Sequence, residues 1–341
     1  MKKKNSADVV LIHNKQSEYF AMNILEELID LRVNVKKLNV IRNQFSNGEQ
    51  YYRLDIPTSF TLLGKDAVYV GAVTDDNDLM DLYRVGSALA LAGIKRRIFV
   101  IPYLCYSSMD RAMLPGEVVT AKTNSQMLGL LGGNEGNIFI FIDLHYACLL
   151  HYFEGPCLRI ELYAQNALIQ AIEEQHFDMT KIMFGSTSLK HSSWVNAYAK
   201  ALGCPISFVR EKYVGSERNS NDFHHEAHSI VGEVKGFHIL IYDDMIRSGK
   251  TVLSAAQMYL DAGATRVDVV TSHLACFNEN IINELISSPI QKIFATNTHP
   301  VTQSEIVKNS DKFVIVDVSG NFLQCLYEIL PTPEHLCRAS I

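Results

Sequence analysis

The stretch that decides the fold is FHILIYDDMIRSGKTVLSAAQMYLDAGATRVDVVTSH, residues 237–273. It contains two apolar runs, residues 237–244, which end in two acids, and residues 266–273. Between these runs, apolar residues recur every three or four positions over residues 251–263, which is the spacing of a buried helix face. The order predicts a strand, a helix and a second strand parallel to the first.

The first half of the chain repeats this order. Residues 66–73 and 96–103 are apolar runs, and residues 77–93 between them carry helical periodicity. In both halves an acidic turn joins the strand to the helix. We therefore predict an α/β protein of two tandem domains, residues 1–155 and 156–341, each with a mainly parallel sheet flanked by helices.

Composition and charge narrow the class of protein. The 341 residues are 48% hydrophobic, and 31 Lys and Arg against 37 Asp and Glu give a net charge of −6, which disfavours non-specific binding to nucleic acid or membranes. No apolar run is long enough for a membrane helix, and the start MKKKNSADVVLIHNKQ lacks the apolar stretch of a signal peptide. Seven scattered Cys without a CxxC pair argue against zinc and fit reduced thiols. We expect a cytoplasmic protein.

The acid pair of the quoted stretch predicts a ligand site. Asp243 and Asp244 end a predicted strand, where open α/β sheets bind ligands, and the turn 248–251 opens a helix whose N–H groups attract anions. A phosphate on the turn and sugar hydroxyls on the acids would suit a sugar phosphate; the acids could also hold Mg²⁺ through water. A nucleotide P-loop is excluded, because Asp244 occupies the place of its first glycine. The alternative is a capped helix beside a solvated acid pair.

Several motifs follow one another in an order known from one family. The chain contains FSNGE (45–49), NDLMDL (77–82), IDLH (142–145), VGEVKG (231–236), AGATRV (262–267) and TNTHP (296–300). Together they resemble the ribose-phosphate diphosphokinases, the PRPP synthetase family. The resemblance implies two type I phosphoribosyltransferase-like domains. It also implies transfer of the β,γ-diphosphate of ATP to the anomeric hydroxyl of ribose 5-phosphate, with Mg²⁺, release of AMP and assembly into homo-oligomers.

The resemblance also implies roles for individual residues. ATP would be bound by Phe45, Asn47, Glu49, Asp110, Arg111 and His145, and His145 would also lie at the metal. The ribose phosphate would be bound by Asp243, Asp244, Arg247, Ser248, Gly249, Lys250, Thr251 and Lys190. Catalysis would depend on Asp243 and Asp244 with Arg210 and Lys212 of a mobile loop. We interpret His224, His225 and His228 of the same region as solvent-facing.

The chain departs from the family pattern at these sites. In CYSSMDR (105–111), Ser108 and Met109 replace an Arg and a Gln that contact the nucleotide. GSTSLKH (185–191) stands where the family has Asp-Ala-Gly-Gly-Ala-Lys-Arg, and only its Lys190 is kept. We interpret Trp194, shortly after, as core packing, with stacking on a base as the alternative.

The third departure changes the charge of the ribose-phosphate turn. Arg247 replaces an acid and Lys250 adds a second cation, so we expect an acceptor with more anionic charge than one phosphate. Three interpretations stay open: a diphosphokinase acting on ribose 5-phosphate, the same transfer to a larger 5-phosphoribosyl acceptor such as ADP-ribose, and a non-catalytic homologue that binds nucleotide or regulates a partner.

Overall fold

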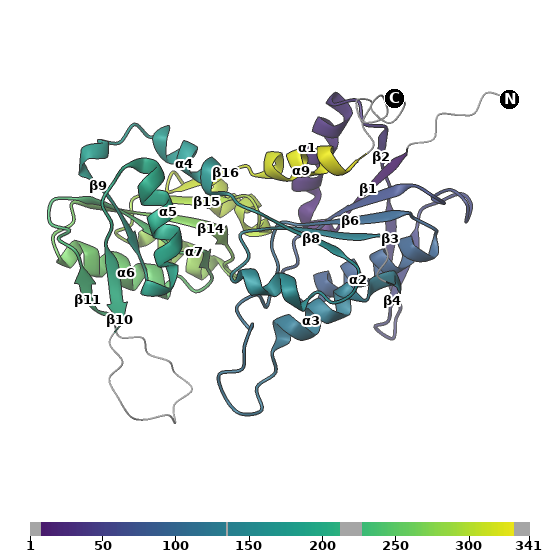
Figure 1. The fold of residues 1–341 in the computed structure, drawn as a ribbon, viewed down its shortest axis with the longest axis horizontal. Helices are drawn as coiled ribbons and strands as arrows, with labels where there is room; N and C mark the ends of the chain where they lie inside the picture. Colours follow the sequence, from purple (N-terminus) through teal and green to yellow (C-terminus); the bar gives the residue numbers. More distant parts are fainter. Residues whose placement is uncertain (1–7, 134–135, 212–226, 331–341) are drawn as a thin grey trace. The chain divides into compact units, whose positions relative to one another are not determined.

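The computed structural model describes residues 8–133, 136–211 and 227–330, and it divides into two compact units (Figure 1). Unit 1 comprises the described residues of Met1–Tyr163 and Val318–Ile341, and unit 2 comprises those of Ala164–Asp317. Each unit is a parallel sheet flanked by helices, so the predicted α/β class is confirmed. Among the described residues, no helix combines the length and apolar character needed to cross a membrane.

The sheet of unit 1 has the strand order β2-β1-β5-β6-β7-β8, and every neighbouring pair is parallel. Its strands are β1 (Val9–His13), β2 (Val35–Lys37), β5 (Asp66–Val70), β6 (Arg96–Ile101), β7 (Asn137–Ile142) and β8 (Leu158–Leu162). The helices are α1 (Glu18–Asp30), α2 (Asp76–Leu91), α3 (Thr120–Gly129) and α9 (Ser319–Ile329). An antiparallel hairpin, β3 (Val40–Gln44) and β4 (Gln50–Leu54), completes the unit.

Unit 2 repeats the plan with the order β16-β15-β14-β12-β9, again parallel. Its strands are β9 (Ile182–Ser186), β12 (His238–Tyr242), β14 (Arg266–Leu274), β15 (Ile293–Thr296) and β16 (Phe313–Val316), with a short β13 (Met245–Ile246) beside β14. β10 (Phe208–Glu211) and β11 (Ala227–Val231) form a separate antiparallel pair. The helices are α4 (Gln165–Glu173), α5 (Ser192–Leu202), α6 (Lys250–Asp261), α7 (Glu279–Ser287) and α8 (Glu305–Lys308).

Burial explains why these sequences form central strands. All five residues of β5, β9 and β12 are buried, which is the pattern of parallel strands covered by helices on both faces. The helix stripe predicted from the quoted stretch faces this core, since Val252, Ala255, Ala256 and Tyr259 of α6 are buried. Because β9 and β12 are parallel neighbours, the loops that follow them open at the same edge of the sheet.

The C-terminal helix α9 belongs to unit 1, although it follows unit 2 in the chain. It packs on α1, where the rings of Phe20 and Phe322 meet edge to face at 5.6 Å. Arg96 Nη1 donates to the carbonyl of Ile329 at 2.7 Å. The compact units thus divide after β8 and reunite residues 318–330 with the first sheet, whereas the expected spans were 1–155 and 156–341.

Candidate functional site

The acid pair lies at the carboxyl end of β12, as the sequence indicated. Asp243 and Asp244 are only 7% and 6% exposed. The amide of Asp243 donates to the carbonyl of Val270 on β14 at 3.1 Å, which fixes the backbone of the pair against the neighbouring strand. The alternative of a solvated acid pair does not fit this burial. Two adjacent carboxylates held inside the protein need a partner that compensates their charge.

One such partner is His191, which comes from the loop after β9. Its Nε2 lies 3.2 Å from Asp244 Oδ1, and its ring stands edge-on to Tyr242 with the centroids 6.0 Å apart. Trp194 is half-buried and packs on the same tyrosine at 6.0 Å, which agrees with core packing. The sequence analysis quoted this loop but singled out only Lys190. The adjacency of β9 and β12, which brings His191 to the acids, is not readable from local spacing.

Burial and charge shift the pKa values of this cluster. Burial raises the pKa of Asp243 to about 7; the nearby His191 opposes this rise, and the charge of Asp244 adds to it. Burial alone would lower the pKa of His191, but its hydrogen bond to Asp244 and the two carboxylate charges outweigh burial, so that pKa is raised. The pKa shifts of Asp243 and His191 therefore depend on each other's charge.

The turn after the acid pair opens α6. Gly249 precedes the helix with φ of 73°, a left-handed conformation that favours glycine. Around it, the side chains of Arg247, Ser248, Lys250 and Thr251 are exposed. The predicted turn residues therefore stand beside a buried acid pair, and the N-terminus of a 12-residue helix adds amide donors there.

Two serine hydroxyl groups of the loop after β9 form hydrogen bonds within the loop itself. Ser186 Oγ donates to the carbonyl of Ser188 at 2.7 Å, and Ser188 Oγ accepts from the amide of Lys190. A side-chain hydrogen bond from Thr187 favours the charged form of Asp243. The serines thus stabilise the shape of the loop. Lys190, next to His191, is exposed and offers a positive charge at the surface.

Three of the residues assigned to ATP gather in unit 1. Buried Asp110 forms an ion pair with Arg111, Nη2 to Oδ2, at 2.6 Å. The guanidinium of Arg111 lies over the ring of Tyr146, 4.5 Å from its centroid, and the ring of His145 meets the same tyrosine edge-on at 4.5 Å. The structure thus brings Asp110, Arg111 and His145 together around Tyr146, a residue that the sequence analysis did not name.

The remaining predicted residues lie elsewhere. Phe45, Asn47 and Glu49 are exposed at the tip of the β3–β4 hairpin, where Phe45 packs on Tyr51 with centroids 5.8 Å apart. Arg210 is exposed on β10. Lys212, His224 and His225 fall outside the described residues, and His228 belongs to β11.

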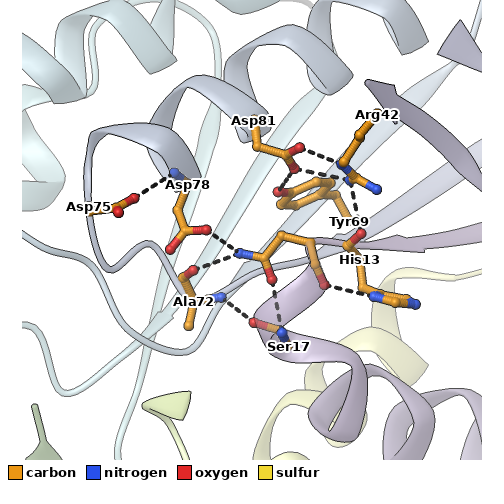
Figure 2. A network of polar contacts seen from close by, with 9 residues as sticks. His13, Ser17, Arg42, Tyr69, Ala72, Asp75, Asp78 and Asp81 are labelled. Atoms are coloured by element: carbon orange, nitrogen blue, oxygen red, sulfur yellow. Dashed lines mark hydrogen bonds and ion pairs between the residues drawn. The ribbon is translucent and has the colours of Figure 1, made fainter. Parts of the chain in front are cut away.

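A buried polar network in unit 1 was also missed by sequence reasoning (Figure 2). At the end of β1, Asn14 Nδ2 donates to the carbonyl of Ala72 at 2.8 Å and to Asp78 Oδ1 at 3.2 Å. The amide of Ala72 in turn donates to Ser17 Oγ at 2.8 Å. These bonds join the carboxyl ends of β1 and β5 to the start of α2, and so fix the edge of the sheet where ligands bind in this class of fold.

A second part of the network centres on Asp81 of α2. Arg42 donates to it through Nε and Nη2, and the hydroxyl of Tyr69 donates to Asp81 Oδ2 at 2.7 Å. Arg42 also donates to the carbonyl of His13, so the hairpin, β1 and α2 meet at one guanidinium (Figure 2). NDLMDL was noted in the sequence only as a family motif, and in the structure its Asp81 is a buried member of the framework.

Two family models and curated relatives show which protein family the chain belongs to. The model for the N-terminal domain of ribose phosphate pyrophosphokinase matches residues 9–132, and the phosphoribosyl synthetase-associated domain matches residues 221–330. The chain belongs to the ribose-phosphate pyrophosphokinase family. A ribose-phosphate pyrophosphokinase of Pyrococcus abyssi is 29% identical over 285 residues, covering 83% of this chain and 91% of the relative. One of Gloeobacter violaceus is 26% identical over 292 residues, covering 85% and 82%.

The solved structures give the fold of this pyrophosphokinase family member. The phosphoribosylpyrophosphate synthetase of Mycobacterium smegmatis superposes with a TM-score of 0.78, covering 94% of this chain and 99% of that one, at 21% identity. The two α/β units are therefore the two phosphoribosyltransferase-like domains of the family.

Proposed function

We propose that this chain transfers the β,γ-diphosphate of ATP to the anomeric hydroxyl of ribose 5-phosphate, forming PRPP and releasing AMP. The observation that carries the proposal is the buried pair Asp243 and Asp244 beside the turn that opens α6. A non-catalytic protein has no need of two adjacent buried carboxylates, whose burial is costly. Family membership supports the same reaction, because the relatives are named for it.

In this proposal the acceptor is held by unit 2. The carboxylates accept hydrogen bonds from ribose hydroxyls, and the amides at the start of α6 bind the 5-phosphate. Holding the sugar at both ends orients its anomeric oxygen for in-line attack, which is the main contribution a protein makes to such a transfer. Arg210 and Lys212 are assigned to the charge that develops on the moving diphosphate.

The nucleotide is assigned to side chains of unit 1. Phe45 offers an exposed ring for adenine. Asn47 and Glu49 offer polar contacts, while Arg111 and His145 offer a cation and an imidazole to the phosphates. Arg111 pairs with Asp110 and lies over the ring of Tyr146. To replace the Arg that the family pattern has at the position of Ser108, it would have to leave this ion pair and bind the phosphates instead.

Mg²⁺ is the cation proposed for the reaction. It prefers oxygen ligands and commonly binds through one or two carboxylates together with substrate phosphates, so the Asp243–Asp244 pair fits it, whereas His145 offers a nitrogen that suits Mg²⁺ less well. Bound with ATP, Mg²⁺ would neutralise phosphate charge. The protein residues position the sugar and the leaving AMP around it.

A second acceptor is favoured by one observation. Arg247 and Lys250 are both exposed on the turn beside the phosphate position, where the family pattern has an acid in place of Arg247. Two further cations suit an acceptor with additional phosphate charge, and ADP-ribose is the compound we propose for this alternative.

The test is AMP release from ATP with Mg²⁺, run in parallel with ribose 5-phosphate and ADP-ribose. Release with ribose 5-phosphate supports the first proposal, and release only with ADP-ribose supports the second. Asp243→Asn removes one buried carboxylate and should lower the rate about 100-fold or more by loosening the sugar. Asp311→Asn, an exposed acid of the same unit, is the matched control and should leave the rate unchanged. No release with either acceptor refutes both transfers and favours a regulatory protein.

A further inference from the structure

Three metal-ligating side chains converge in unit 2. His191, Asp243 and Asp244 each offer a ligand atom, and these atoms all lie within 4.8 Å of one another. Ligands around one ion stand about 3–4 Å apart when each is about 2.1 Å from it, so a small inward movement would bring all three atoms to ligating distance of one ion. The two carboxylates follow β12 and the imidazole follows β9, which are hydrogen-bonded neighbours. The rigid sheet therefore holds the three donors at one edge.

The charge of this cluster favours a cation. Both carboxylates are more than nine-tenths buried, and like charges so placed oppose each other's ionisation. His191, which pairs with Asp244, carries a positive charge only when its ring is protonated. A divalent ion would supply that charge permanently.

The imidazole of His191 has a second nitrogen that the described part of the chain does not use. Nδ1 is buried and has no hydrogen-bond partner among the described residues. A neutral imidazole carries one proton, so when Nε2 donates to Asp244 the Nδ1 lone pair is left without a contact. The ring is nevertheless held in orientation by its edge-on contact with Tyr242. An ion between the three side chains would bind through Nε2, the nitrogen that faces Asp244, and the ring proton would then lie on Nδ1. Imidazole nitrogen is a ligand that transition ions prefer.

We propose that His191, Asp243 and Asp244 form a protein-resident site for a divalent transition ion such as Mn²⁺, which the site prefers over Mg²⁺. One nitrogen with two carboxylate oxygens is a mixed ligand set, whereas Mg²⁺ favours oxygen alone. Binding would displace any proton held by the ligating groups into solvent. The two carboxylates are those assigned above to the ribose and to Mg²⁺, so the inference concerns the same site as the proposed transfer. It is measured apart from the transfer, because the site would take up its ion without nucleotide or sugar.

The experiment is a titration of the full chain with Mn²⁺ alone, with free Mn²⁺ followed by electron paramagnetic resonance and Mg²⁺ added as competitor. We expect one tight Mn²⁺ per chain, displaced by Mg²⁺ only at large excess. His191→Asn should weaken Mn²⁺ at least 10- to 100-fold, the range seen even for residues that only support ligands, while Mg²⁺ changes less. His151→Asn, an exposed histidine outside the cluster, is the matched control.

Two further variants separate ligation from simple charge compensation. His191→Arg supplies a permanent cation without a metal-binding lone pair, so it should keep the fold, checked by circular dichroism, and abolish Mn²⁺ binding. His191→Asp replaces nitrogen by oxygen and should reduce the preference for Mn²⁺ over Mg²⁺. Equal affinities of the wild type for the two ions, or Mn²⁺ binding unchanged in folded His191→Asn or His191→Arg, would overturn the proposal. AMP release decides the proposed reaction separately, because it is assayed with Mg²⁺.

Discussion

The substitution Arg42→Met tests whether the network around Asp81 holds unit 1 together. Asp81 is buried, with a side chain 8% exposed, and it accepts hydrogen bonds from Arg42 and from the hydroxyl of fully buried Tyr69. Methionine keeps much of the volume of the arginine stem but removes both charge and donors. The carboxylate of Asp81 would then keep its hydrogen bond from Tyr69 and its contact with the hydroxyl of Tyr52, but no cationic partner among the described residues.

The expected loss of stability follows from how deeply Arg42 and Asp81 are buried. Breaking a buried ion pair by removing one partner costs about 3–5 kcal/mol, but the side chain of Arg42 is 28% exposed, so water relieves part of the penalty and we expect about 2–3 kcal/mol. Since each factor of ten corresponds to about 1.36 kcal/mol, local opening of this region should become about 30- to 160-fold more frequent.

Native-state hydrogen exchange measured by mass spectrometry resolves this effect. Peptides from β5 and α2 should exchange faster in Arg42→Met, while peptides from β12 and α6 of unit 2 serve as the internal control. The double variant Arg42→Met with Asp81→Leu should cost less than the sum of the two single variants, because no charge is left buried. A change below about 1 kcal/mol in Arg42→Met would refute the reasoning, because the pair would then behave like an exposed one.

Two further predictions concern unit 2, whose unfolding the single Trp194 reports by fluorescence. Burial lowers the pKa of His299 to about 3. As pH falls below about 6.5, the unfolded chain therefore binds a proton at His299 and the folded chain does not. The free energy of unfolding decreases as pH falls from about 6.5 to about 3. His299→Asn keeps an acceptor for the amide of Val301 and should reduce the loss between pH 6.5 and 5 by about 1–2 kcal/mol; an unchanged pH dependence would contradict the burial argument. Gly249→Ala should cost about 1–2 kcal/mol through its left-handed φ and raise the KM for the acceptor, whereas Ser248→Ala beside it should leave stability unchanged.

The fold was predictable because its signals are local. The run 237–244, the helical stripe and the run 266–273 became β12, α6 and β14 within a few residues, since period and burial act along the chain. The return of α9 to unit 1 was not predictable. It depends on a contact between Phe20 and Phe322, which no local pattern connects.

The candidate site was predictable only in part for the same reason. Asp243, Asp244 and Gly249 follow one strand, so their proximity could be inferred from the strand alone. The meeting of His191 with Asp244 depends on β9 lying next to β12, and that of Arg42 with Asp81 depends on how the hairpin packs on α2. Such pairs are set by sheet order and helix packing, which a single sequence does not give.

The position of His191 shows that two of the departures from the family pattern change the charge near the same acid pair. In the loop after β9, His191 stands at the position where the family pattern noted above has an Arg, so the group beside the two buried carboxylates carries a positive charge only when it is protonated. The loop after β12 carries Arg247 and Lys250, but both are exposed and therefore screened by water. Exposed cations are poor compensation for buried acids and good partners for a ligand's phosphates. Under the two proposals the substitutions divide between two needs: Arg247 and Lys250 are assigned to the acceptor, and His191 is assigned to a metal ion beside the acids.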